Sequence, residues 1–176
     1  FVCKSLFGLP KTTPTAAIMV NTGALYASIR VQLRQLIYLQ KVLKKDDQHW
    51  TKTTLTALKQ HNWGWAKQIE ECLEEWGLEC DWGIIKAKSV MQWKREVYEA
   101  AERKNVNKIK EECYKKERGV AVEKTKTKTI IPTLDNEEYK RQPHPFIMKN
   151  GKLKARAFIM GRHGMLQCAA NFANGY

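Results

Sequence analysis

The side chains that most often carry out acid–base or metal chemistry are scattered along this chain of 176 residues. Its four histidines stand at positions 49, 61, 144 and 163, and three of them lie beside turns or breaks in the predicted helices. A metal site needs ligands at paired spacing on one surface, and the sequence has no such spacing. It also lacks a glycine-rich phosphate loop, a G-x-S-x-G elbow and an H-E-x-x-H helix. We therefore predict no catalytic residue, no metal and no cofactor.

The carboxylates occur mainly in two clusters, residues 70–75 and 96–112, where lysines stand beside them. Acids and bases at this spacing form i,i+4 ion pairs on the solvent-facing side of a helix. We therefore expect these carboxylates to be surface charges, and we expect the chain not to act as an enzyme by itself.

The cysteines also argue against a site of their own. They stand at positions 3, 72, 80, 113 and 168, an odd count at irregular spacing with no C-x-x-C pair. This pattern favours reduced cysteines that serve as small core residues, and hence an intracellular compartment, nuclear or cytoplasmic. No apolar run approaches the roughly 18 residues that a membrane span needs, and no secretory signal is visible. Because the chain does not begin with Met, we expect it to be a piece of a longer protein.

The positive charges show the clearest pattern in the sequence. The net charge is +13, and all 18 acidic residues lie between positions 46 and 138. The two ends therefore carry cations alone. Before position 46 these are Lys4, Lys11, Arg30, Arg34, Lys41, Lys44 and Lys45, and after position 138 they are Lys140, Arg141, Lys149, Lys152, Lys154, Arg156 and Arg162. Single-sign fields attract a phosphate backbone or an anionic membrane.

The elements that must position these cations are predicted to be helices. Over residues 26–44, Ile29 and the leucines at 33, 36, 39 and 43 fall on one face, while cations fall on another. The alternative is that this basic face is merely solvated. Further helices are predicted over residues 14–21, 51–61, 63–76, 90–118 and 152–160. We expect Gly77 to end the helix over 63–76, and a turn to follow over residues 81–83. Ser89 should cap the helix over 90–118, and Gly119 should end it. Near residues 105–107 we expect this helix to bend or to divide into two helices.

The predicted fold class is therefore mainly α, an irregular multi-helix bundle with an extended Lys/Thr-rich linker near residues 120–134. We expect a helical bundle over residues 1–119, the linker over 120–134 and a basic helical segment over 135–176. The six tryptophans lie between positions 50 and 93. Trp65, Trp76 and Trp93 sit on apolar helix faces and are expected in the core, whereas Trp50, Trp63 and Trp82 lie near turns and could serve as stacking platforms for bases.

Two segments resemble the region after the polymerase core in reverse transcriptases of LINE-type (non-LTR) retrotransposons. The first, residues 6–43, is "LFGLPKTTPTAAIMVNTGALYASIRVQLRQLIYLQKVL", and the second, residues 139–176, is "YKRQPHPFIMKNGKLKARAFIMGRHGMLQCAANFANGY". The residues that match the family's first pattern are Gly8, Pro10, Thr13, Pro14, Ala16, Ala17, Gly23, Leu25, Tyr38, Leu39 and Leu43, and those that match the second are Asn171, Phe172 and Tyr176. The fingers, the palm and the paired catalytic aspartates of that family are absent, and in the family a Cys/His knuckle usually follows.

The resemblance implies a fragment of a retrotransposon polyprotein that binds RNA or DNA without catalysing a reaction. Cations of both ends are expected to contact backbone phosphates. These are Arg30, Arg34, Lys41, Lys44, Lys45, Lys140, Arg141, Lys149, Lys152, Lys154, Arg156 and Arg162. The remaining domains of the parent polyprotein would be further partners. An alternative is a structural or protein-interaction segment that braces those domains. Binding to an anionic membrane fits the charge less well, because the basic faces bear few exposed aromatic residues, and no membrane partner is predicted.

Overall fold

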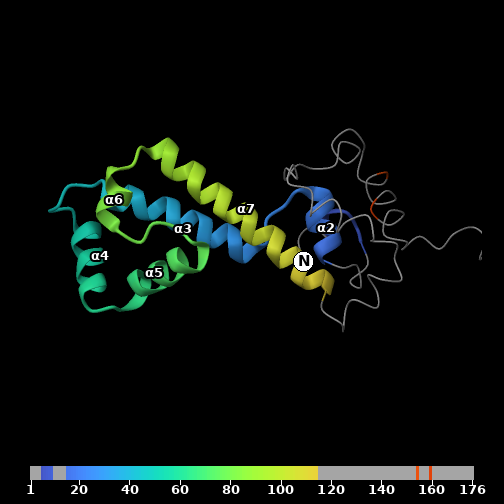
Figure 1. Ribbon diagram of the computed structural model, residues 1–176, viewed down its shortest axis with the longest axis horizontal. Helices are drawn as coiled ribbons and strands as arrows, with labels where there is room; N and C mark the ends of the chain where they lie inside the picture. Colours follow the sequence, from blue (N-terminus) through green and yellow to red (C-terminus); the bar gives the residue numbers. More distant parts are fainter. Residues whose placement is uncertain (1–4, 10–14, 115–153, 155–158, 160–176) are drawn as a thin grey trace, which may run out of the picture. The chain divides into compact units, whose positions relative to one another are not determined.

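Helices α2 to α7 account for most of the chain that the computed structural model describes, namely residues 5–9, 15–114, 154 and 159 (Figure 1). These residues include no strand, so the mainly α prediction is confirmed. The helices are α2 (Thr15–Thr22), α3 (Ala27–Leu43), α4 (Trp50–Gln60), α5 (Gly64–Trp76), α6 (Trp82–Ala87) and α7 (Val90–Tyr114).

The chain divides into two compact units. A central unit, Tyr26–Asn105, contains α3, α4, α5, α6 and the first part of α7. The other unit combines Phe1–Leu25 with Val106–Tyr176 and contains α2. Within this second unit a small buried apolar cluster comprises Leu9, Ile18 and Ile159, with Phe7 packed against it.

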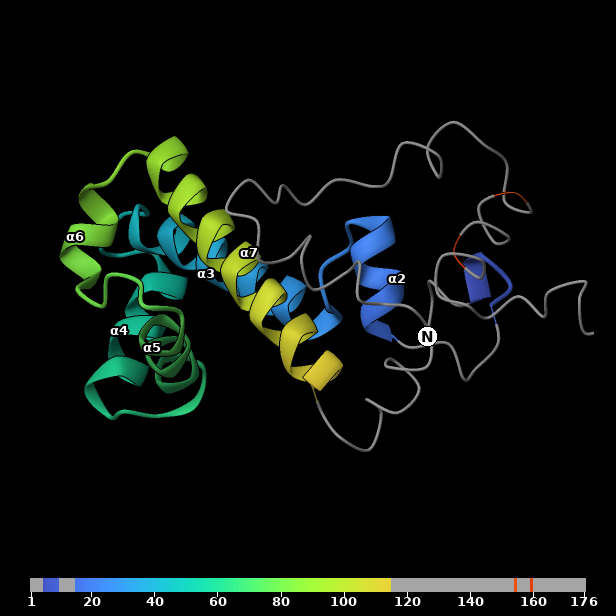
Figure 2. The same cartoon turned by 45° about the vertical axis from the view of Figure 1, so that its right-hand side comes forward.

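In the central unit, α3 is the helix around which the others are arranged. Helices α4, α5 and α6 contact it, and α7 runs beside it in both views (Figures 1 and 2). The predicted apolar face of α3 is the buried one, since Leu36 and Leu39 are fully buried. Burying a leucine side chain stabilises a fold by about 1.5–3 kcal/mol. Apolar side chains from the other helices complete this core: Leu55, Ile69, Leu73, Ile85, Trp93 and Val97.

The ends of two helices follow from single residues, as predicted. Helix α5 ends at Gly77, whose φ of 63° is left-handed, a conformation that costs residues with a Cβ atom about 1–2 kcal/mol. The backbone N–H of Leu78 then donates to the carbonyl of Leu73 over 2.9 Å, which closes the turn. At the start of α7, Ser89 Oγ accepts a hydrogen bond from the backbone N–H of Gln92 over 3.1 Å. This bond satisfies one of the free N–H groups at a helix start.

Two predictions about the central part of the chain are wrong. Residues 81–83 do not form a plain turn, because Asp81 caps α6: its Oδ1 accepts from the N–H groups of Gly83 and Ile84. Helix α7 is also continuous through residues 105–107, so it is not divided into two helices there, which was one of the two arrangements expected. The polar Asn105 can stay buried within this helix because its Oδ1 accepts a hydrogen bond from the backbone N–H of Tyr26 over 3.1 Å.

The tryptophans divide between core and surface. Trp76 and Trp93 are buried as predicted, and Trp65 is half-buried. Trp82 is also buried, and the Lys59 ammonium lies 4.0 Å from its ring centroid. Trp50 and Trp63 remain 72% and 71% exposed.

Several predictions lie outside the described residues and stay predictions. These are the linker over 120–134, the stop at Gly119, the domain boundaries at 119 and 134, and most of the helix expected over 152–160. Among the helices that the structure does describe, none has both the length and the apolar character of a membrane span.

Candidate nucleic-acid interface

The exposed face of α3 carries the first set of predicted phosphate contacts. Arg30, Arg34 and Lys41 are all exposed, on the side of the helix opposite its buried leucines. At 100° per residue they lie within about 40° of one another around the helix axis. We call this surface, with Lys44 and Lys45 just beyond its C-terminal end, the α3 basic face.

No acidic side chain in the described residues pairs with the α3 basic face. The ion pairs of the central unit involve other cations. For example, Lys104 pairs with Glu75 at 2.6 Å and Lys88 pairs with Glu96 at 2.6 Å. The remaining pairs are Lys52–Asp47, Lys59–Glu70, Lys67–Glu71 and Arg95–Glu99. Ion pairs thus compensate cations on α4, α5 and α7, whereas the α3 basic face has none; the exposed Lys94 and Arg103 on α7 are also without an ion pair among the described residues.

The two lysines after α3 also take part in the fold. Lys44 Nζ donates to the carbonyl oxygen of Lys88 over 2.7 Å, and Lys45 Nζ lies 3.2 Å from His49 Nε2. An ammonium group has three donors, so one such bond leaves its charge and further donors available to a phosphate.

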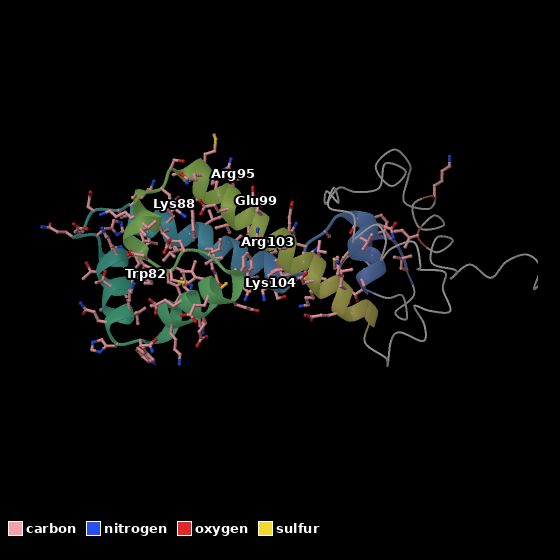
Figure 3. The ribbon with its side chains drawn as sticks, viewed as in Figure 1. Trp82, Lys88, Arg95, Glu99, Arg103 and Lys104 are labelled. Carbon is pink, nitrogen blue, oxygen red and sulfur yellow. The ribbon has the colours of Figure 1, made fainter. Side chains whose placement is uncertain are left out.

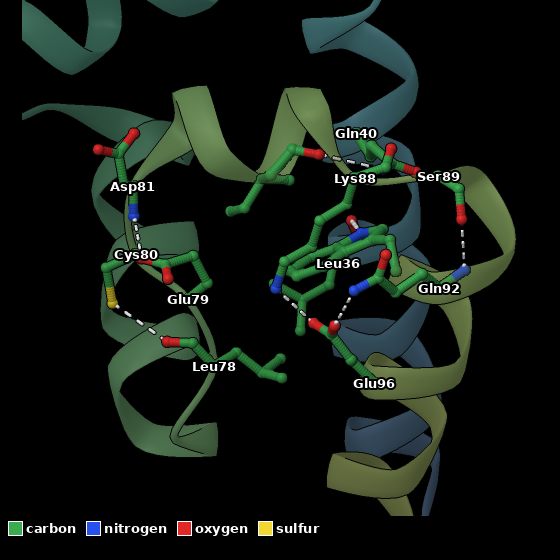
Figure 4. A network of polar contacts seen from close by, with 12 residues as sticks. Leu36, Gln40, Leu78, Glu79, Cys80, Asp81, Lys88, Ser89, Gln92 and Glu96 are labelled. Atoms are coloured by element: carbon green, nitrogen blue, oxygen red, sulfur yellow. Dashed lines mark hydrogen bonds and ion pairs between the residues drawn. The ribbon is translucent and has the colours of Figure 1, made fainter.

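A buried glutamine fixes the C-terminal half of α3 against the α6–α7 connection (Figure 4). Gln40 Nε2 donates to the carbonyl oxygens of Ile85 and Lys88, each over 3.0 Å. One turn earlier, Trp93 Nε1 donates to the carbonyl oxygen of Leu36 over 3.0 Å. Two of these three bonds are buried and the third is partly buried, so they hold α3 in one orientation beneath its basic face.

An aromatic pair lies in the same surface, and the sequence analysis did not identify it. Tyr38 is 47% exposed, and its ring centroid lies 5.9 Å from that of Trp65, at the start of α5, with the ring planes tilted by 52°. Tyr38 stands four residues after Arg34 and three before Lys41, so all three share one helix face. The position of Tyr38 on the basic face could have been predicted from this spacing. The contact with Trp65 could not, because Trp65 belongs to another helix.

The second set of predicted contacts lies almost entirely outside the described residues. Lys154 is described, and it is helical and exposed. The six others, Lys140, Arg141, Lys149, Lys152, Arg156 and Arg162, are not.

The titratable groups with shifted pKa values do not suggest a reaction centre. The hydrogen bond from Lys52 lowers the pKa of Asp47, and the same bond raises the pKa of Lys52. Burial, with a smaller contribution from Glu75, raises the pKa of the Cys72 thiol to about 11. A raised pKa reduces the thiolate that a nucleophile or metal ligand requires. In the described part of the chain, no group of three or more His, Cys, Asp or Glu residues could hold a metal ion.

Comparison with known proteins assigns no relative to the chain. No protein-family model, no curated protein and no solved structure matches it.

Proposed function

We propose that this chain is a non-catalytic module that binds the phosphate backbone of RNA or DNA through the α3 basic face. The observation that carries the proposal is the segregation of charge. Six of the other eleven cations of the central unit form an ion pair, while Arg30, Arg34 and Lys41, which lie together on one helix face, form none among the described residues. A surface that needs only solubility mixes its signs.

The spacing of these cations suits a polyanion. At 1.5 Å per residue, Arg30 lies about 6 Å along the helix axis from Arg34 and about 16 Å from Lys41. A nucleic-acid strand carries one phosphate per roughly 3.4 Å of duplex axis, so the face spans several phosphates. Such contacts position the nucleic acid without reading its sequence.

The resemblance to LINE-type reverse transcriptases gives the proposal its biological setting. In that setting the chain is the helical segment after the polymerase core, and the parent's catalytic residues lie elsewhere in the polyprotein. Its partners are then RNA or DNA and the parent's remaining domains. Its location is nuclear or cytoplasmic, as for a retrotransposon protein.

A charge-reversal pair tests the assignment to α3. The variant R30E/R34E should lose at least tenfold in affinity for RNA or duplex DNA, since two phosphate contacts become repulsions. The matched control is R95E/R103E, because both arginines are exposed on α7 and the net charge changes equally (Figure 3). Affinity measured between ~50 and ~200 mM salt should fall steeply for the wild type and the control. Equal losses in the two variants, or a flat salt response, would contradict the proposal.

A protein-interaction segment is the second candidate, and the exposed apolar side chains favour it. Trp50 and Trp63 project into solvent, and Met91 is 83% exposed. Exposed tryptophans often anchor protein interfaces. If R30E/R34E leaves nucleic-acid affinity unchanged but prevents assembly with the parent's other domains, this second function is the correct one.

A further inference from the structure

The α3 basic face contains an aromatic platform between its cations. Tyr38 lies on the exposed side of α3 between Arg34 and Lys41, and nearly half of its surface is open. Trp65 supports the ring from α5 at a centroid distance of 5.9 Å. A ring held in this way loses little conformational freedom when a ligand stacks on it.

The surroundings of the platform are suited to an anion that also carries flat rings. Arg34 is one helical turn from Tyr38 on one side and Lys41 is one turn away on the other, at about 6 Å and 4.5 Å along the axis. Trp65 lies in the first turn of α5, where the helix dipole is positive and no side chain caps the free N–H groups. A nucleotide whose base stacks on Tyr38 would place one flanking phosphate near Arg34 and the other near Lys41.

From this geometry we propose that the α3 basic face binds single-stranded nucleic acid, with one unpaired base stacked on Tyr38 and its flanking phosphates on Arg34 and Lys41. The proposal rests on the proposed function and specifies its substrate. In a duplex the faces of each base are covered by its neighbours, so only an unpaired base can occupy the platform. Base–aromatic stacking tolerates any sequence, because every base has a π face.

The test compares three probes of equal length: a single strand, the same strand with abasic sites throughout, and a duplex. Tyr38→Leu should weaken binding of the single strand roughly 5- to 150-fold, the range that loss of one stacked base gives. It should leave affinity for the abasic strand and the duplex nearly unchanged, and Tyr38→Phe should restore single-strand binding. Tyr98→Leu is the control, since Tyr98 is similarly exposed but lies on α7. RNA and DNA versions of the single strand show which sugar is preferred.

The outcomes distinguish the stacking proposal from the proposed phosphate binding on which it rests. If R30E/R34E weakens every probe while Tyr38→Leu weakens none, the stacking role is overturned and the phosphate role stands. If the wild type binds no probe, both fall. Photocrosslinking of the wild type to a strand carrying 5-iodouracil gives a check that does not depend on a variant's folding. Crosslinks at Tyr38 or Trp65 support the platform, and crosslinks confined to other elements overturn it.

Discussion

At the scale of single residues, burial rather than sequence position decides what each cysteine can do. Cys72 is buried on α5, and the loss of solvation raises the pKa of its thiol to about 11. Cys80 is exposed. At pH 8 a thiol with that pKa is ionised in only about one molecule in a thousand. Slight burial and nearby glutamates also raise the pKa of the Cys80 thiol, but this residue is accessible to a reagent. The expectation of small core cysteines therefore holds for Cys72 and fails for Cys80.

This difference predicts selective alkylation. In the native protein, iodoacetamide at pH 8 should modify Cys80 at least tenfold faster than Cys72, because the reagent needs an accessible thiolate. Peptide mapping by mass spectrometry measures both rates in one sample. In concentrated guanidinium chloride the two rates should converge. Equal rates in the native protein would show that Cys72 is not packed as the structure has it.

Single residues also explain which tryptophan assignments were possible from the sequence. Trp93 follows the helical period of α7, so its burial could be predicted. Trp82 stands beside a glycine in a stretch that reads as a turn. Its burial depends on α6 and on Lys59, 23 residues earlier in the chain, whose ammonium lies over the ring. Contacts of this kind are set by tertiary packing and leave no local pattern.

At the scale of elements, the helices with a regular apolar period were predicted well. Helix α3 was expected over residues 26–44 and is found over Ala27–Leu43, and α5 ends where Gly77 was expected to end it. Helix α6 was missed because six residues are too few to show a period. The buried Asn105 looked like a break in α7, since a sequence does not reveal that its partner is the backbone of Tyr26.

The cap of α6 can be tested directly. Asp81→Ala removes the acceptor for two N–H groups, one of them at 2.6 Å, and should lower the free energy of unfolding by about 1 kcal/mol. For a unit of this size that corresponds to a fall of roughly 4–8 °C in Tm. Asp46→Ala is the control, because Asp46 is an exposed aspartate that caps no helix. Asp81→Asn should retain most of the stability. Equal Tm values for the Asp81→Ala and Asp46→Ala variants would contradict the capping role.

At the scale of the whole molecule, the sequence predicted the charge layout but not its arrangement in space. The acid-free N-terminal stretch proved to include a rigid, exposed basic face on α3. The acid-free C-terminal stretch lies mainly outside the described residues, and the aromatic pair within the α3 face became visible only when α5 was seen to pack against it. Distance along the chain therefore limited what could be predicted about the candidate site.

The contribution of the C-terminal cations can be measured from the salt dependence of binding. Replacing all seven, from Lys140 to Arg162, with glutamine changes no residue of the apolar cluster that contains Ile159. Each lost phosphate contact should reduce the slope of log K against log salt by about 0.7 for a single strand, so the full set could remove up to roughly 5 units. Lys67→Gln with Arg95→Gln is the control, since both cations already have acidic partners. A second variant replaces Arg30, Arg34 and Lys41 with glutamine. If both basic ends contact the same strand, combining the two sets of substitutions should reduce the slope by the sum of their separate effects. An unchanged slope for the C-terminal variant would restrict binding to α3 alone.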